Sequence, residues 1–226
     1  MSPVRAGRIP NNRSNQYIME IKWHGESTFT IKGKKTTVVI NPVDGGKHKL
    51  KETKADTVLL TDDYHEKAKL LKGTEKSEVI NWPGEYEVQG AAIVAIPAYT
   101  NEREEGNTDK GRILVFSLLV DDIRICHLAE LGEPLDEEIL GKIGDIDILI
   151  VPTASKKALD NKKIHEAIEE IDPRVVIPML YDNNEDLEKL LKEMSVTEHE
   201  VLESFEAKAK SALPEDRTDF VVLKAV

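Results

Sequence analysis

The order of strand-like and helix-like segments constrains the fold more than any other feature of this sequence. From residue 17 onward, short runs rich in β-branched residues end at glycine, proline or polar residues, as in KTTVVINP and AAIVAIP. In the second half, buried strand patterns such as DILIVP and RVVIP alternate with amphipathic helix patterns such as DNKKIHEAIEEI. This order predicts an α/β domain over residues 17–226, with two mixed β-sheets face to face and helices outside. Within it, HEKAKLLKG predicts a short helix that ends at Gly73.

Composition and charge narrow the classes of partner and compartment. Residues 1–16 are mildly basic, lack an apolar stretch and predict a disordered N-terminal tail. No apolar run approaches the ~20 residues of a membrane-spanning helix. The net charge of −11 disfavours nucleic-acid binding, which needs clustered Lys and Arg. The single cysteine, Cys126, lies in an apolar run, which predicts a buried thiol and, with no disulfide to form, a cytoplasmic protein.

Several segments resemble, in order and spacing, those of the metallo-β-lactamase fold: IKWHGESTFTIKG, ADTVLLT, WPGEYEVQG, RICHLAELGEPL and RVVIPMLY. Within that superfamily the chain is similar to the small Zn-dependent hydrolases of the L-ascorbate-6-phosphate-lactonase-like branch. The resemblance runs from about Tyr17 to Val226. It implies a four-layer αβ/βα sandwich with a dinuclear metal site on the loops along one edge, where imidazoles and carboxylates hold zinc and activate water.

The positions at which this family carries its metal ligands hold other residues here. The family's His-x-His-x-Asp-His motif corresponds to residues 62–67, and the later ligands to three further positions. The residues at the ligand positions are Asp62, Tyr64, Glu66, Lys67, Thr100, Glu130 and Leu180. His65 falls between ligand positions, so its side chain is expected to point elsewhere.

Positions that orient the ligands in such sites differ as well. Glu26 stands where the family has a histidine, Asn41 where it has an aspartate, and Ala154–Ser155 where it has two glycines. The scaffold segments are retained while both sets of site residues differ from the family pattern.

These replacements predict a protein that keeps the hydrolase fold without metal or catalysis, because a hydrolytic dizinc centre needs nitrogen donors. Such a pseudo-hydrolase is expected to act as a binding, scaffold or regulatory partner of another protein, or as a homo-oligomer. The alternative is a metal-dependent hydrolase with a carboxylate site, since the oxygens of Asp62, Glu66 and Glu130 suit Mg²⁺ or Ca²⁺ better than zinc. Lys67 is expected to occupy the space of the metal and to neutralise these carboxylates.

The remaining histidines carry no spacing signature of a catalytic triad. His127 follows the RIC strand pattern and is predicted to be partly buried with its hydrogen bond satisfied. The others are expected to be scattered and exposed: His24, His48, His165 and His199.

Overall fold

The computed structural model describes residues 18–107, 109–153, 155–181, 184–197 and 199–226. Its strands form two sheets of mixed direction. The six-stranded sheet has the order β13 (Phe205–Ala207), β1 (Met19–Gly25), β2 (Thr28–Lys32), β3 (Thr37–Ile40), β4 (Thr57–Leu59) and β5 (Glu78–Ile80). The eight-stranded sheet has the order β12 (Glu200–Leu202), β14 (Asp219–Leu223), β11 (Val175–Met179), β10 (Ile148–Pro152), β9 (Ile123–His127), β8 (Arg112–Val120), β7 (Ala91–Tyr99) and β6 (Gly84–Val88).

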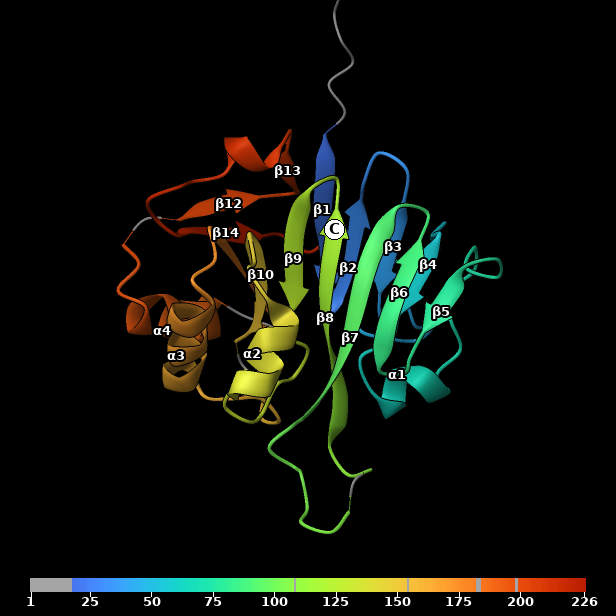
Figure 1. Cartoon of the computed structure of the whole chain (residues 1–226), viewed down its shortest axis with the longest axis horizontal. Helices are drawn as coiled ribbons and strands as arrows, with labels where there is room; N and C mark the ends of the chain where they lie inside the picture. The colour runs from blue at the N-terminus through green and yellow to red at the C-terminus, as the bar shows by residue number, and fades with distance from the viewer. Residues whose placement is uncertain (1–17, 108, 154, 182–183, 198) are drawn as a thin grey trace, which may run out of the picture.

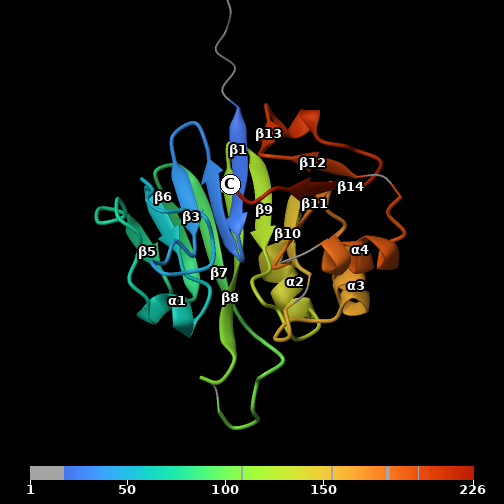
Figure 2. The same ribbon diagram turned by 180° about the vertical axis from the view of Figure 1, so that it is seen from behind.

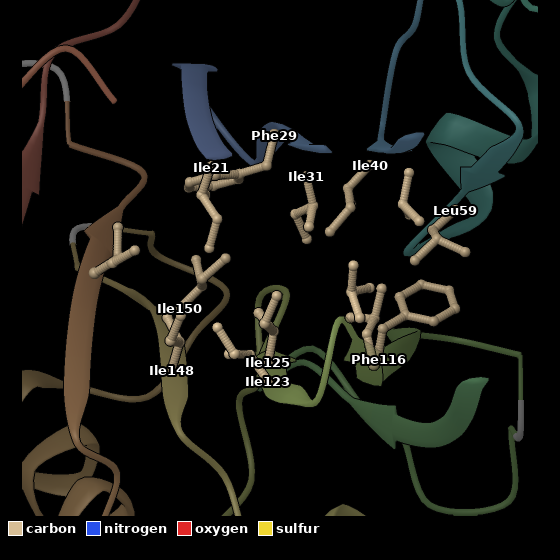
Figure 3. Close-up of a cluster of buried hydrophobic side chains, with 14 of the residues drawn as sticks. Ile21, Phe29, Ile31, Ile40, Leu59, Phe116, Ile123, Ile125, Ile148 and Ile150 are labelled. Carbon is tan, nitrogen blue, oxygen red and sulfur yellow. The ribbon is translucent and has the colours of Figure 1, made fainter. Parts of the chain in front are cut away.

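The two sheets face each other across one apolar core. Figure 3 shows Ile21, Phe29 and Ile31 from the first sheet pointing toward Ile125 and Ile150 of the second. These side chains are fully buried and belong to one cluster that draws on strands of both sheets. One face of each sheet therefore packs against the other, as a β-sandwich requires, and β10 and β11 of the eight-stranded sheet are buried on both faces.

Helices cover the outer face of the eight-stranded sheet. They are α2 (Glu137–Ile143), α3 (Asn161–Ile171) and α4 (Asn184–Glu193), which gather on one side of the molecule in both ribbon views (Figures 1 and 2). Ile143, Ile164 and Ala167 pack there into a second apolar cluster with residues of β8 and β10. The predicted sandwich is confirmed, including the apolar stripe of the helix that begins after Asp160.

The first helix differs from its prediction in both length and position. α1 (Asp63–Lys67) begins two residues before the predicted His65 and ends well before Gly73. Asp62 caps its first turn by accepting a hydrogen bond from the backbone N–H of His65. Beyond the helix, Leu71 N–H bonds to the carbonyl of Pro42, so the predicted continuation is tied to the end of β3 instead. Strand β13 was not predicted from the sequence.

Two predictions from the sequence concern the chain termini and membranes. The tail of residues 1–16 lies outside the described residues, and its disorder stays a prediction. None of the helices in the described ranges is long and apolar enough to cross a membrane.

Candidate functional site

The candidate site lies where the carboxyl ends of parallel strands from both sheets meet. β3, β4 and β5 run parallel to one another, as do β9, β10 and β11. The carbonyl of Thr61, after β4, accepts a hydrogen bond of 2.7 Å from Leu114 N–H of β8, which joins the two sheets at this edge. In Figure 1, α1 and the loop after β7 lie at the lower edge of the sandwich.

Asp62 and His65 form a carboxylate–imidazole pair at this edge. His65 Nδ1 lies 2.6 Å from Asp62 Oδ1, and the same oxygen accepts the backbone N–H of His65 at 3.0 Å. Both side chains are largely buried, with 15% and 18% of their surfaces exposed. The expectation that His65 points away from the ligand positions is wrong, because the capping geometry brings a side chain three residues after the cap back toward it.

The charge state of Asp62 follows from this pairing. Burial raises the pKa of the Asp62 carboxyl, but the hydrogen bonds and charge of His65 outweigh burial and leave that pKa below its usual value. An ionised Asp62 accepts the proton on His65 Nδ1, so the lone pair of the neutral ring is at Nε2.

A buried polar network behind this pair is centred on Asn41. Its side chain donates to Ser27 Oγ at 2.8 Å and to Thr61 Oγ1 at 2.9 Å, and accepts from Thr61 N–H at 3.0 Å. Its own carbonyl accepts from Thr28 Oγ1 at 3.0 Å. Asn41 is fully buried, so this network fixes the end of β4, from which Asp62 and α1 follow.

The other carboxylates at the predicted ligand positions have separate partners. Glu66 Oε1 lies 3.7 Å from Arg112 Nη2, at the start of β8. Glu130 accepts a very short hydrogen bond from Ser155 Oγ, across from the end of β9. Each of the three carboxylates that could be ligands of a hard cation therefore has a different partner: His65, Arg112 or Ser155. Ala154, beside Ser155, lies outside the described residues.

The remaining predicted positions offer little to a metal. Tyr64 is 63% exposed. Lys67 is also exposed, so the prediction that it occupies a buried space in place of the metal is wrong. Thr100 is buried, and its hydroxyl accepts the backbone N–H of Glu102. Leu180 packs against the core between the sheets. Glu26 accepts the backbone N–H of Lys47.

The backbone at this edge is strained although its side chains differ from the family pattern. Glu26, Asn41, Ala129 and Leu180 all have φ between 51° and 60°, a left-handed conformation that non-glycine residues adopt at a cost. All four are at, or next to, positions where the resemblance places site residues. Such outliers gather at functional sites when the surrounding structure holds them in place.

His127, the last residue of β9, is a second imidazole near this edge. It is fully buried, its ring meets that of Phe29 edge to face at 5.7 Å, and Nδ1 accepts the N–H of Ala129 at 3.2 Å. Among the described residues Nε2 has no hydrogen-bond partner. The prediction that His127 is only partly buried is thus wrong, and the prediction that its hydrogen bonds are satisfied holds for Nδ1 but not for Nε2. His24 and His48 are also buried, so the prediction that they are exposed is wrong. Their ring nitrogens contact the backbone carbonyls of Val226 and Val43, and these contacts are not evident from residue spacing.

His127 predicts a measurable loss of stability in acid. Burial lowers its pKa to about 3, while an unfolded chain binds the proton near pH 6.5. Between these values only the unfolded state is protonated, so stability falls as pH falls, by roughly 1 kcal/mol per pH unit. His127→Gln keeps an acceptor for Ala129 and does not titrate. Urea unfolding between about pH 6 and 4 should show a slope smaller by about that amount.

Two other histidines are relevant to that experiment, His24 as a second buried imidazole and His165 as a control. Burial also lowers the pKa of His24, so the variant reduces the slope and does not abolish it. His165→Gln removes an imidazole from the partly exposed face of α3 and is the matched control for the substitution itself. Equal slopes in wild type and His127→Gln would contradict the prediction.

The residues present do not fit a dizinc centre. Within the described part of the chain, no three His, Cys, Asp or Glu side chains gather where they could hold a metal ion. His127 cannot add a nitrogen ligand, because Nδ1 already accepts the Ala129 N–H and Nε2 therefore carries the proton. No described residue is therefore assigned as a metal ligand.

Comparison with known families decides the ancestry of the chain. The model of the β-lactamase superfamily domain matches residues 20–180. The chain belongs to the β-lactamase superfamily. The resemblance predicted from the sequence segments is confirmed.

Similar proteins within the superfamily are named as enzymes. The UPF0173 metal-dependent hydrolase of Methanopyrus kandleri is 25% identical over 193 residues, which are 72% of this chain and 84% of the relative. A protein of the same name from Thermoplasma acidophilum is 29% identical over 200 residues, 73% of this chain and 84% of the relative. A crystal structure from Thermotoga maritima, assigned as a Zn-dependent hydrolase of this superfamily, superimposes with a TM-score of 0.74 at 26% identity, covering 91% of this chain and 98% of the other.

These relatives overturn two expectations drawn from the ligand positions. The prediction of a catalytically inactive protein is contradicted, since the similar chains are named metal-dependent hydrolases. The prediction that no cofactor is used is contradicted by the same names and by the Zn-dependent structural relative. The inference failed because it treated absent histidines as absent chemistry. It also discounted His65, although the spacing Asp62-x-x-His65 is that of a helix cap, and it did not consider Arg112 or Trp82.

Proposed function

We propose that this β-lactamase superfamily member is a hydrolase that activates water with the Asp62–His65 pair, and that it shares the cation requirement of its relatives. The observation that carries the proposal is the 2.6 Å contact between His65 Nδ1 and Asp62 Oδ1, within the segment where the family has its metal-binding motif. The membership of the chain and the names of its relatives support the reaction class.

The pair supplies the proton chemistry that hydrolysis needs. His65 Nε2 takes a proton from a water molecule, whose oxygen then bonds to the acyl or phosphoryl centre of the substrate. Asp62 stabilises the imidazolium that forms and keeps the ring in the required tautomer. The imidazolium returns the proton to the departing oxygen, which balances the reaction.

The cation requirement is a separate part of the proposal. It is supported by the names of the relatives. The carboxylates of Asp62, Glu66 and Glu130, a ligand type that suits hard cations, contact His65, Arg112 and Ser155 here, so a cation that binds them would displace these partners.

Activity with defined cations tests the proposal. Purified protein is stripped with chelator, then given Mg²⁺, Ca²⁺, Mn²⁺ or Zn²⁺ in turn, and assayed on a panel of lactones and phosphodiesters. We expect turnover that disappears on chelation and returns with at least one cation. Absence of turnover with every cation would contradict the hydrolase, and turnover that chelation does not change would contradict the cation requirement.

Two features of the cellular setting remain proposals as well. A cytoplasmic location is supported by the single, fully buried Cys126, which has no disulfide partner in the sequence. A protein partner or a homo-oligomer is expected from the sequence. Nucleic acid is an improbable ligand because the chain carries a net charge of −11.

A further inference from the structure

Trp82 is a large exposed aromatic residue beside the proposed site. It lies two residues after the end of β5, and Asp62 lies three residues after the end of the parallel neighbour β4, so both follow strand ends at the same edge of the sheet. The guanidinium carbon of Arg112 lies 5.2 Å from the centre of the Trp82 ring. Arg112 is adjacent to Ile113, which pairs with Asp62 in a β-bridge. Trp82 therefore contacts Arg112, whose chain neighbour Ile113 pairs with Asp62.

The Trp82 ring is held in place although 62% of the residue is exposed. The backbone carbonyl of Trp82 accepts a hydrogen bond of 2.9 Å from the hydroxyl of Tyr86. Its ring packs against Arg112, which in turn lies 3.7 Å from Glu66 on α1. An indole costs about 2 kcal/mol or more to leave in water, so a fixed, exposed indole is typical of a binding surface.

We infer that Trp82 is a stacking surface for a planar ring of the ligand, which makes aryl or heteroaryl esters the substrate class. The substrate assignment rests on the proposed hydrolase; the binding of a planar ring does not. Aromatic faces select flat, polarisable groups over saturated groups of equal size, because stacking needs close contact across the whole face. Arg112 supports the indole from one side through a cation–π contact and leaves Trp82 exposed to a ligand.

Intrinsic fluorescence tests this assignment without any turnover. The chain has two tryptophans, and Trp23 is only 4% exposed, so changes in emission on ligand binding at the surface report Trp82. Benzoate is compared with cyclohexanecarboxylate, and AMP with ribose 5-phosphate; each pair shares its anionic group and differs in the planar ring. We expect saturable quenching by a planar probe and none by its non-planar counterpart.

Two variants decide whether Trp82 causes the selectivity. Binding of the quenching probe, measured by equilibrium dialysis, should weaken about tenfold in Trp82→Leu and stay within about threefold of wild type in Trp82→Phe. Failure of both planar probes to bind in preference to their counterparts, or equal binding to wild type and Trp82→Leu, would overturn the inference. This test is independent of the hydrolase proposal. Binding of a planar probe without turnover in the cation panel would support the stacking surface and contradict the hydrolase.

Discussion

Replacing His65 by Gln is expected to lower kcat/KM at least about a hundredfold on whichever panel substrate the protein hydrolyses, because general-base catalysis contributes about 10²–10⁴. Gln can still donate to Asp62 and so can preserve the packing of α1, but it cannot take a proton from water. The loss should therefore appear in kcat, with KM little changed, and the free energy of unfolding should stay within about 1 kcal/mol of wild type.

Two companion variants distinguish a catalytic role from a structural one. Asp62→Asn keeps a capping residue at the start of α1, yet its amide no longer stabilises an imidazolium, so kcat should fall about tenfold or more. His165→Gln removes an imidazole from α3, far along the chain from this pair, and should leave kcat unchanged. A wild-type kcat in His65→Gln would show that His65 is not the general base.

Much of the fold was predictable because its determinants are local in the sequence. The apolar run RILVFSLLV became β8, and the stripe of Ile164 and Ala167 packs against the sheet as its spacing predicts. β13 was missed because three residues containing an exposed glutamate, Phe205–Ala207, carry almost no pattern of their own. That strand exists because it pairs with β1, which lies near the other end of the chain.

The site was predicted less well, since its contacts join distant segments. The spacing identified which residues occupy the family's ligand positions, but the conclusion drawn from them, that no cofactor is used, is contradicted by the names of the relatives. It gave no indication that Glu66 faces Arg112 or that Glu130 bonds to Ser155, because Arg112 begins β8 and Ser155 lies in the segment after β10, both far from their partners in the sequence. It also did not predict that α1 ends at the exposed Lys67, or that the chain beyond it bonds to Pro42 through Leu71 N–H.

Asn41→Ala is expected to be the most destabilising single substitution at this edge, by about 3 kcal/mol. It leaves Thr61 N–H without its acceptor and the hydroxyls of Ser27 and Thr61 without their donor, all in a buried setting. It also puts alanine at a φ of 52°, where asparagine is better tolerated. Urea unfolding measures the loss. Asn101→Ala, which removes an amide from an exposed loop, is the matched control and should cost under about 1 kcal/mol.

Asn41→Asp, which restores the family's residue, separates the effect of charge from that of shape. The serine and threonine hydroxyls can rotate to donate to a carboxylate, so the hydroxyl contacts can survive, but full burial disfavours the ionised form. The pKa of the new carboxyl should therefore lie above its unfolded value, and the variant should lose stability as pH rises through that range and recover it in acid. This dependence is opposite in sign to that of His127. A variant as stable as wild type at neutral pH would show that the edge already supplies positive charge to position 41, which the described contacts of Asn41 do not provide.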